Sequence, residues 1–312
     1  HLSTFLKCVM CPRGRHFFVK RGFILNITKK FATFDEQLEF IENKGFKVSD
    51  REECLNFLKR VNYYDISAYF LPFRNSDHTI QKGIEFKRIY KIYEFDKKIR
   101  SLIFSVIEEI ELYLRTQLAY YHAEKYGALG YKSKENFSEF YDHQEFLTRI
   151  KYECIKRNNK NAVIVHHNEK YNGQIPIWVL VSFFSIGTLS RFYGNMKTSD
   201  KKAIAKNLYS TKLKLLESWL KCLTVLRNKC AHYSRLYFLK FSNYPKLPKN
   251  SNLETNSRLF GQLLVLKFLH INDNSWNNNF LISLESLLEE YSKYIRFMDI
   301  GFPYNWKETL SK

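Results

Sequence analysis

The segment between Ile84 and Tyr126 constrains the fold of this chain most, because it contains neither proline nor glycine. Its apolar residues recur with the 3.6-residue period of an α-helix, which predicts one long amphipathic helix. These residues are Ile89, Ile92, Tyr93, Ile99, Leu102, Ile103, Val106, Ile107, Ile110, Leu114 and Leu118. Gly127 and Gly130 follow and end the helix. We expect it to be the spine of the fold.

Capping signals and apolar periodicity predict helices in most of the remaining chain. Thr33 and Glu36 have the spacing of a capping box, in which a hydroxyl and a carboxylate satisfy backbone groups at a helix start. The expected helices cover residues 35–43, 50–71 with Pro72 as the stop, 136–158, 176–192, a short lysine-rich helix capped at Ser199 and Asp200, a helix opened by Ser210 and Thr211, 258–270 and 280–298. No strand–helix alternation, internal repeat or glycine-rich nucleotide-binding motif occurs. The fold class is therefore expected to be all-α.

The chain divides into four expected regions. They are a basic arm at 1–30, an N-terminal helical segment at 31–80, a helical core at 81–240, and a loop with C-terminal helices at 241–312 that packs on the core. The arm contains Cys8, Cys11 and His16. A zinc site needs four ligands, and no second ligand pair follows at a suitable spacing. We expect no metal there, and the arm could bind RNA or be autoinhibitory.

The composition narrows the classes of function. The chain has 312 residues, of which 45% are hydrophobic, and 50 Lys and Arg against 31 Asp and Glu give a net charge of +19. Such a charge is typical of a nucleic-acid-binding protein, although a solvated basic surface explains it too. Six cysteines are too sparse for a disulfide framework, which favours the cytoplasm. No run of 18 or more apolar residues occurs, so no membrane span is expected.

The stretch from Leu226 to Arg235 combines residues that could carry chemistry. On a regular helix, Asn228, His232 and Arg235 share one face, and Arg227 lies about 140° from His232 at its border. Imidazole transfers protons near neutral pH, and guanidinium binds two phosphate oxygens at once. A histidine and an arginine at a helix end also bond carbonyls and favour the negative end of the helix dipole. The residues alone leave both interpretations open.

A second polar group lies on the long helix. Glu108, Glu111 and Arg115 follow the i, i+3, i+7 spacing of one helix face, and Glu111 and Arg115 are placed for an ion pair. Such a stripe is usually a solvated face, and packing alone is an equally good account of the two glutamates.

The order of motifs resembles the Abi-like family of phage abortive-infection proteins, the AbiD/AbiF type, whose core is a HEPN domain. The resemblance covers residues from about 33 to 306. It rests on Leu55–Leu58, Val61–Tyr64, Tyr69, Pro72–Phe73, Ile89–Tyr90, Tyr93, Phe95–Asp96, Ile99–Arg100, Ile107–Glu111, Leu114–Thr116, Tyr171, Ile175–Trp178, Phe184–Ser190, Ser218–Leu220, Leu226–His232, Gly301–Pro303 and Asn305–Trp306. Where the family usually has asparagine, this chain has Phe238, which puts any polar role there in doubt.

The resemblance implies a HEPN-type helical bundle with additional N- and C-terminal helices, and an endoribonuclease activity. It implies that the catalytic residues are Arg227, Asn228 and His232, that Arg235, Lys229 and Arg115 bind RNA, and that Glu108 and Glu111 orient the arginine or support the fold. The RNA 2′-hydroxyl would attack the neighbouring phosphate, leaving a 2′,3′-cyclic phosphate and a 5′-hydroxyl, with no metal and no small-molecule cofactor.

The resemblance also implies a homodimer with a composite site. A single copy offers one imidazole, whereas phosphodiester transfer calls for a base and an acid. A second interpretation is a non-catalytic RNA-binding scaffold that forms a ribonucleoprotein with a structured small RNA. A third is a helical protein-interaction domain, which would leave the basic charge unused. The RNA target and the trigger for activity are not indicated by the sequence.

Overall fold

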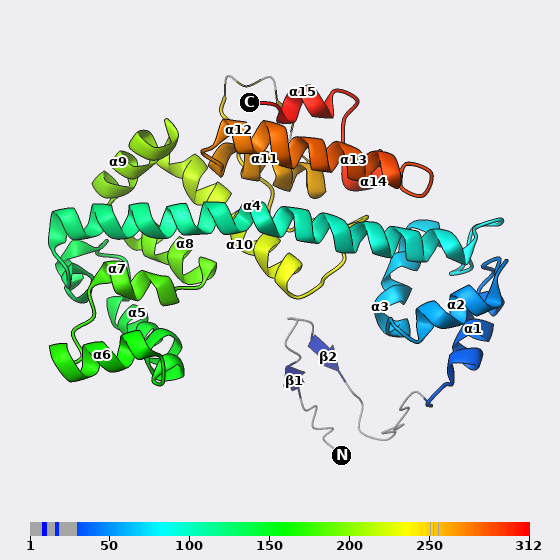
Figure 1. Cartoon of the computed structure of the whole chain (residues 1–312), viewed down its shortest axis with the longest axis horizontal. Coiled ribbons are helices and arrows are strands. Elements are labelled where there is room, and N and C mark those ends of the chain that lie inside the picture. The colour runs from blue at the N-terminus through cyan, green and yellow to red at the C-terminus, as the bar shows by residue number, and fades with distance from the viewer. Residues whose placement is uncertain (1–7, 11–15, 19–29, 250, 252, 255) are drawn as a thin grey trace, which may run out of the picture.

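Helix α4 crosses the whole molecule and confirms the predicted spine (Figure 1). It runs from Phe86 to Tyr126, and Gly127 ends it with a φ of +78° that glycine adopts without strain. The protein is known here from a computed structural model, which describes residues 8–10, 16–18, 30–249, 251, 253–254 and 256–312, with only the backbone of the first two stretches.

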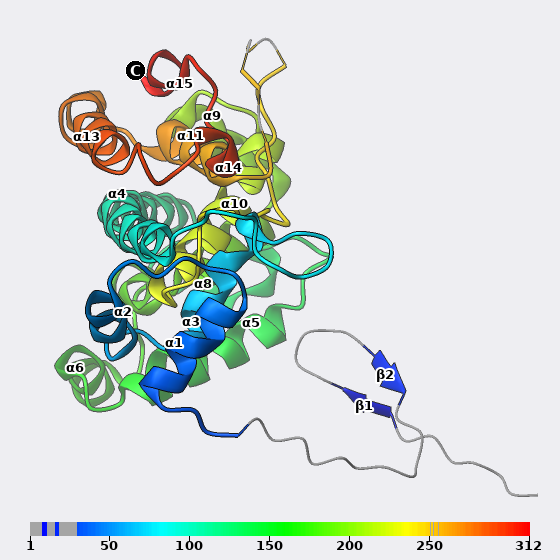
Figure 2. The same cartoon turned by 90° about the vertical axis from the view of Figure 1, so that its right-hand side faces the viewer.

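The other helices pack on two sides of α4, as the view turned by 90° also shows (Figure 2). On one side lie α11 (Leu259–Leu269), α12 (Asp273–Ser275), η7 (Trp276–Leu281), α13 (Ile282–Glu290), α14 (Phe297–Ile300) and α15 (Trp306–Leu310). On the other lie η2 (Gly130–Lys132), η3 (Lys134–Asn136), α5 (His143–Arg149), η4 (Ile150–Ile155), η5 (Lys156–Asn158), α6 (Ala162–Tyr171), α7 (Ile177–Leu180), η6 (Val181–Phe183), α8 (Ile186–Asn195) and α10 (Leu213–Ala231). Near the ends of α4 lie α1 (Phe34–Asn43), α2 (Arg51–Leu58), α3 (Tyr63–Ser67), η1 (Ala68–Phe73) and α9 (Thr198–Tyr209).

The N-terminal region contributes a small antiparallel ribbon. Strand β1 (Cys8–Met10) pairs with β2 (His16–Phe18), with Cys8 opposite Phe18. Most of the expected basic arm, including Cys11, lies outside the described residues, as does the side chain of Cys8. All the other named elements of the described chain are helical, and the predicted all-α class is confirmed.

The capping box at the start of α1 is confirmed. The hydroxyl of Thr33 accepts a bond of 3.2 Å from the backbone N–H of Glu36, whose carboxylate accepts one of 2.6 Å from the N–H of Thr33. The predicted helix at 258–270 is also confirmed, as α11. In both places the local sequence signal and the packing agree.

The single helix predicted at 50–71 is wrong. Helix α2 ends at Leu58, and the extended Asn62 begins α3 by accepting a bond of 2.8 Å from the N–H of Tyr64. The chain then tightens into η1, which contains Pro72. The spacing of the apolar residues predicted one continuous helix, but the asparagine cap starts a new helix within it.

The helix predicted at 176–192 is also two helices. Phe184 is extended, and the hydroxyl of Ser185 caps α8 by accepting a bond of 3.1 Å from the N–H of Thr188. Pro176 occupies the position before α7 and not its first turn. This break leaves the carbonyl of Phe184 free to accept a side-chain bond from α4.

Other predicted boundaries moved for similar reasons. The helix expected from 136 begins at His143, where Asp142 supplies the cap, and the one expected at 280–298 ends at Glu290. Helix α6 was not predicted. Asp200 does not cap α9 but is buried and binds Tyr126 of α4 at 2.7 Å. Ser210 ends α9 in the left-handed conformation, so α10 begins later, at Leu213.

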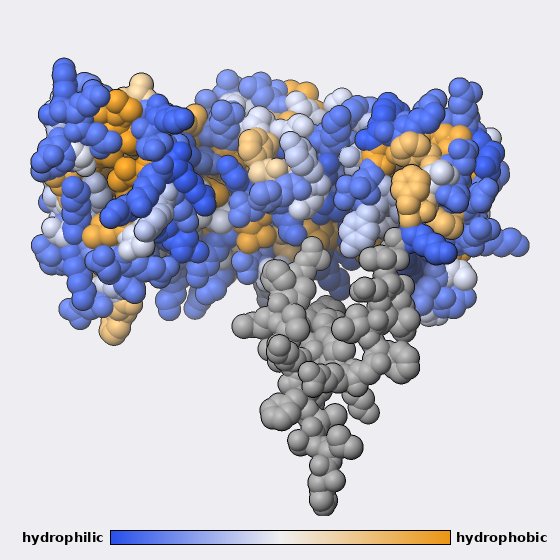
Figure 3. Space-filling model, turned by 90° about the horizontal axis from the view of Figure 1, so that it is seen from below, coloured by the Kyte–Doolittle hydropathy of each residue, from blue (hydrophilic) through white to orange (hydrophobic). Residues whose placement is uncertain are grey.

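The surface of the molecule is mainly hydrophilic on the face seen from below, and its hydrophobic side chains form separate patches (Figure 3). The buried apolar residues form one cluster that includes Leu38 of α1, Leu226 of α10 and Leu310 of α15. No helix in the described part of the chain is both long and apolar enough to cross a membrane.

His122 of α4 is the most isolated polar group of this core. It is 1% exposed, and neither ring nitrogen has a hydrogen-bond partner within the described chain. Its ring lies 5.1 Å from that of Tyr126, 5.5 Å from Phe137 and 5.2 Å from Phe192. Burial lowers the pKa of His122 to about 4, against a smaller opposing effect of Asp200.

Acid should therefore destabilise this fold through His122. Its pKa is lower in the folded chain than in the unfolded chain, so the unfolded chain binds the proton first as the pH falls below about 6.5. Between pH 7 and pH 5 this should remove about 2 kcal/mol from the free energy of unfolding. Urea unfolding of wild type and His122→Phe at both pH values measures the effect. A variant that loses as much stability as wild type would contradict it, and the exposed His166→Phe is the control.

Candidate functional site

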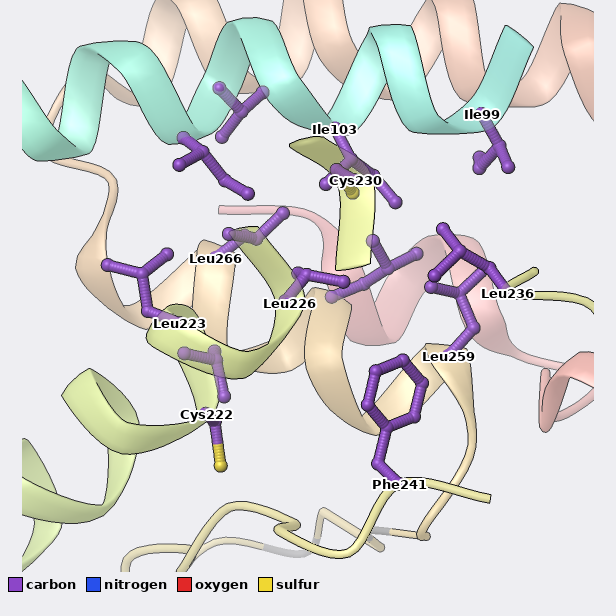
Figure 4. Close-up of a cluster of buried hydrophobic side chains, with 14 of the residues drawn as sticks. Ile99, Ile103, Cys222, Leu223, Leu226, Cys230, Leu236, Phe241, Leu259 and Leu266 are labelled. Carbon is purple, nitrogen blue, oxygen red and sulfur yellow. The ribbon is translucent and has the colours of Figure 1, made fainter. Parts of the chain in front are cut away.

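Helix α10 presents one face to the core and the other to solvent. Its residues Leu223, Leu226 and Cys230 lie among Ile99 and Ile103 of α4 and Leu259 and Leu266 of α11, all of which are buried (Figure 4). This packing sets the rotation of α10 about its axis. Asn228 and His232 are therefore exposed.

The end of α10 is a Schellman motif, a helix end closed by two nested backbone hydrogen bonds. The N–H of Tyr233 donates to the carbonyl of Cys230 at 3.2 Å, and the N–H of Ser234 donates to that of Lys229 at 2.9 Å. Tyr233 has a φ of +53° and is 83% exposed, although glycine is usual at this position. The exposed ring of Tyr233 makes little packing contact that could offset this backbone strain.

The expectation that Asn228, His232 and Arg235 share one helix face is wrong at Arg235. The helix ends at Ala231, and His232 is its C-cap, whose N–H still donates to the carbonyl of Asn228 at 3.0 Å. Beyond the left-handed Tyr233, the chain no longer follows the helix. Asn228 and His232 remain one turn apart on one side.

Arg227 lies on the side of α10 that faces α4. Its Nε is 4.0 Å from a carboxylate oxygen of Glu111, and its guanidinium lies 5.9 Å from the ring centre of Phe104. Glu111 also binds Arg115 at 2.5 Å, which confirms the predicted ion pair. Arg115 donates to the carbonyl of Phe184 at 2.7 Å. At the junction of α4, α8 and α10, Glu111 thus binds Arg115 directly and lies near Arg227, whose Nε is buried with no hydrogen-bond partner among the described residues.

The remaining predicted site residues lie around this junction. Glu108 is exposed on α4, and Lys229 is half-buried on α10. Arg235 is half-buried, and its Nη1 is buried with no hydrogen-bond partner among the described residues. Burial lowers the pKa of Arg235, while Asp96 opposes this. The structure groups Arg227, Glu111 and Arg115, and it places Arg235 in a more enclosed setting.

Cys230, inside the motif, is not a candidate nucleophile. It is buried, and burial raises the pKa of its thiol to about 12. A thiol with such a pKa stays protonated at neutral pH and acts as a small apolar residue.

Asp96 of α4 is a residue whose role sequence reasoning missed. Its carboxylate is 0% exposed and accepts bonds from the N–H groups of Leu236 at 2.7 Å and Tyr237 at 2.9 Å, and from the hydroxyl of Tyr69 at 2.9 Å. Its neighbour Arg100 lies 3.6 Å away. Asp96 therefore fastens the segment that follows His232 to the long helix.

A sequence signal for Asp96 existed. It falls on the apolar face of the long helix with Ile92, Ile99 and Ile103, where an unpaired carboxylate is costly. Arg100 stands four residues later, the spacing of a helical ion pair. Arg100 itself donates to the carbonyl of Ser234 at 3.2 Å, so both members of the pair hold the same segment.

Phe238 has a backbone conformation that is unusual for phenylalanine. Its φ is +56°, a conformation that asparagine tolerates better than phenylalanine. Its ring lies 4.8 Å from the guanidinium of Arg258, which offsets part of the strain. An asparagine at this position would therefore suit the turn without any role in chemistry.

Two hollows flank the junction. One, of about 650 Å³, lies between α4 and α7 and is lined by Leu112, Arg115, Tyr120 and Trp178 among others. The second, of about 500 Å³, lies between α8 and α10. The first hollow thus includes Arg115 of the junction, and the second follows the part of α10 that precedes Arg227.

These features define a helical protein with a histidine and an asparagine exposed at a helix end beside a clamped arginine. A family model described as Abi-like protein matches residues 56–238, which is more than half of the chain. The chain therefore belongs to the Abi-like protein family, and this membership indicates a role in abortive infection, a form of phage defence. No curated protein and no solved structure matches the chain.

Removing the Asp96 carboxylate should unfold the region of the site. Asp96→Ala leaves Arg100, two backbone N–H groups and a tyrosine hydroxyl without their buried acceptor. A loss of about 3 to 5 kcal/mol in the free energy of unfolding is expected, measured by urea denaturation. Glu94→Ala, which removes a half-buried ion pair with Lys91 on the same helix, should cost less than about 1 kcal/mol. Equal losses in the two variants would contradict this role.

Replacing Tyr233 by glycine should stabilise the protein. Glycine adopts the left-handed conformation without strain, and the exposed ring contributes little packing, so a gain of up to about 1 kcal/mol is expected. Tyr233→Ala keeps the strain and is the matched control, with no gain expected. Thermal unfolding of the three proteins decides the point, and a less stable Tyr233→Gly would show that the ring packs.

Proposed function

We propose that this protein is a phage-defence endoribonuclease with the HEPN-type architecture, and that it cuts RNA at a site shared by two copies of the chain. The observation that carries the proposal is the end of α10, where His232 and Asn228 face solvent while Arg227 is held against Glu111. Their exposure leaves the imidazole and the amide accessible to a ligand.

Each side chain then has a role in transesterification. His232 of one copy takes the proton of an RNA 2′-hydroxyl, whose oxygen forms a bond to the adjacent phosphorus. The bond from phosphorus to the 5′-oxygen breaks, and His232 of the second copy donates a proton to that oxygen. Arg227 stabilises the charge on the phosphorane, and Asn228 positions the phosphate or the imidazole. The products are a 2′,3′-cyclic phosphate and a 5′-hydroxyl.

Exposed apolar side chains beside the site support the homodimer. Phe104, Leu112 and Tyr120 are exposed on α4, and Trp178 of α7 borders the same hollow as the last two. Arg227 reaches the first of them. A second copy that covered these side chains would remove apolar area from water and bring its own His232 near the first.

One observation favours a second candidate function, the non-catalytic RNA scaffold. The side chain of Arg227 is only 30% exposed, and its guanidinium lies near Glu111 and the ring of Phe104. An arginine with these contacts is less free to move with the phosphate as its charge develops in the transition state. In a scaffold, the RNA would be bound and protected by the same surface.

His232→Ala should abolish cleavage by removing both proton transfers. Purified wild type and variant are incubated with total RNA from phage-infected cells, and the ends of the fragments are mapped and tested for cyclic phosphate. The variant should cut at least about 100-fold more slowly, since general acid–base catalysis contributes on that scale. His166→Ala, an exposed histidine on α6, should leave the rate unchanged.

The same assay tests the shared site. Activity per molecule should fall on dilution, together with the dimer fraction measured by sedimentation. Protected RNA of discrete size in both wild type and His232→Ala would favour the scaffold. Fragments formed equally by the two proteins would rule out the nuclease.

A further inference from the structure

The groove between α8 and α10 is a second feature of this face. It has a volume of about 500 Å³, and the two helices that form it lie side by side (Figure 1). Its walls consist of Gly187, Ser190, Arg191, Gly194 and Asn195 from α8, Glu217, Lys221, Thr224 and Val225 from α10, and Asn243 from the following loop. Most of these residues are polar, small or cationic, unlike those of the hollow beside α7.

The lining of the groove ends at Thr224 and Val225, about one turn of α10 before Asn228. Lys221, Thr224 and Asn228 stand at i, i+3 and i+7, which is one face of α10, and His232 follows Asn228 by one turn. From Lys221 to Asn228 the helix rises by about 10 Å. A chain molecule that lay in the groove would therefore pass over Asn228 and reach the exposed imidazole.

The charge of the groove is positive. Arg191 and Lys221 are exposed, and within the described part of the chain neither forms an ion pair with a carboxylate. The acidic residue of the wall, Glu217, is neutralised by Lys201, whose Nζ lies 2.8 Å from its carboxylate and donates to the carbonyl of Gly194 at 3.0 Å. Two uncompensated cations thus remain, one on each wall.

The wall formed by α8 contains two glycines, so a ligand can closely approach the helix backbone there. A side chain at Gly194 would meet nothing within 4 Å, so the space beside it is open, and one at Gly187 would meet Thr224 at 3.7 Å. The hydroxyl of Ser190 and the amide of Asn243 lie among the lining groups. Paired cations, neutral hydrogen-bonding groups and a low wall suit a phosphate-bearing chain better than an apolar helix.

We propose that this groove holds the sugar–phosphate backbone of a single-stranded RNA segment and directs it onto Asn228 and His232. Arg191 and Lys221 bind phosphates on opposite sides of the strand. The inference rests on the proposed function only in taking RNA as the ligand; the groove can bind the strand whether or not the site cuts it.

The test measures binding apart from cleavage. All proteins carry His232→Ala, and the affinity for a fluorescent single-stranded RNA is measured over a range of salt concentrations. Arg191→Glu/Lys221→Glu should raise the dissociation constant at least about 10-fold. It should also reduce the slope of the logarithm of the binding constant against the logarithm of the salt concentration by about 0.7 for each lost phosphate contact. Lys132→Glu/Lys134→Glu changes the net charge equally at exposed positions after α4, and should change affinity by less than about 3-fold.

Two further measurements keep the outcomes separate. Arg191→Gln/Lys221→Gln replaces the first variant if circular dichroism shows that the glutamates unfold it, and it too should weaken binding.

Equal affinity and salt dependence for groove and control variants would overturn the proposal, as would binding of poly-glutamate as tight as that of RNA. If wild type binds RNA through the groove without cutting it, the nuclease fails and the groove stands. If wild type cuts RNA and the groove variants bind normally, only the groove fails.

Discussion

The carboxylate of Asp96 is the interaction on which the rest of the site depends. It lies inside the protein, on the apolar face of α4, and binds the backbone of Leu236 and Tyr237, far away in sequence. A buried carboxylate is tolerable only with several donors, and three donors and Arg100 surround it. Because two of these donors, the N–H groups of Leu236 and Tyr237, belong to the segment after α10, Asp96 fixes the path of the chain beyond His232.

Helix α4 therefore has two tasks. Its apolar face carries the core that joins both groups of helices, and its polar groups contact the last turn of α10 and the segment that follows it. Asp96 and Arg100 hold the segment after the helix, while Glu111 holds Arg227 and, through Arg115, the start of α8.

Sequence reasoning succeeded where a local signal and the packing agree. The long helix, the capping box at Thr33 and helix α11 are such cases. It failed where a capping side chain interrupted an apolar pattern, as at Asn62 and Ser185, because the pattern of buried residues does not show where the backbone turns. It also failed at Tyr233, where a tyrosine occupies a conformation usual for glycine.

The sequence by itself determined the all-α class, a spine helix between Ile84 and Tyr126, membership of the Abi-like family, and Arg227, Asn228 and His232 as the candidate site residues. Only the tertiary structure decided that α10 stops at Ala231, that Arg235 leaves its face, and that Asp96 holds the segment beyond it. The physical reason is the separation along the chain between the groups that interact. Helical periodicity and caps are set by neighbours within one or two turns, whereas a buried carboxylate finds its donors across the fold, where no local pattern records the pairing.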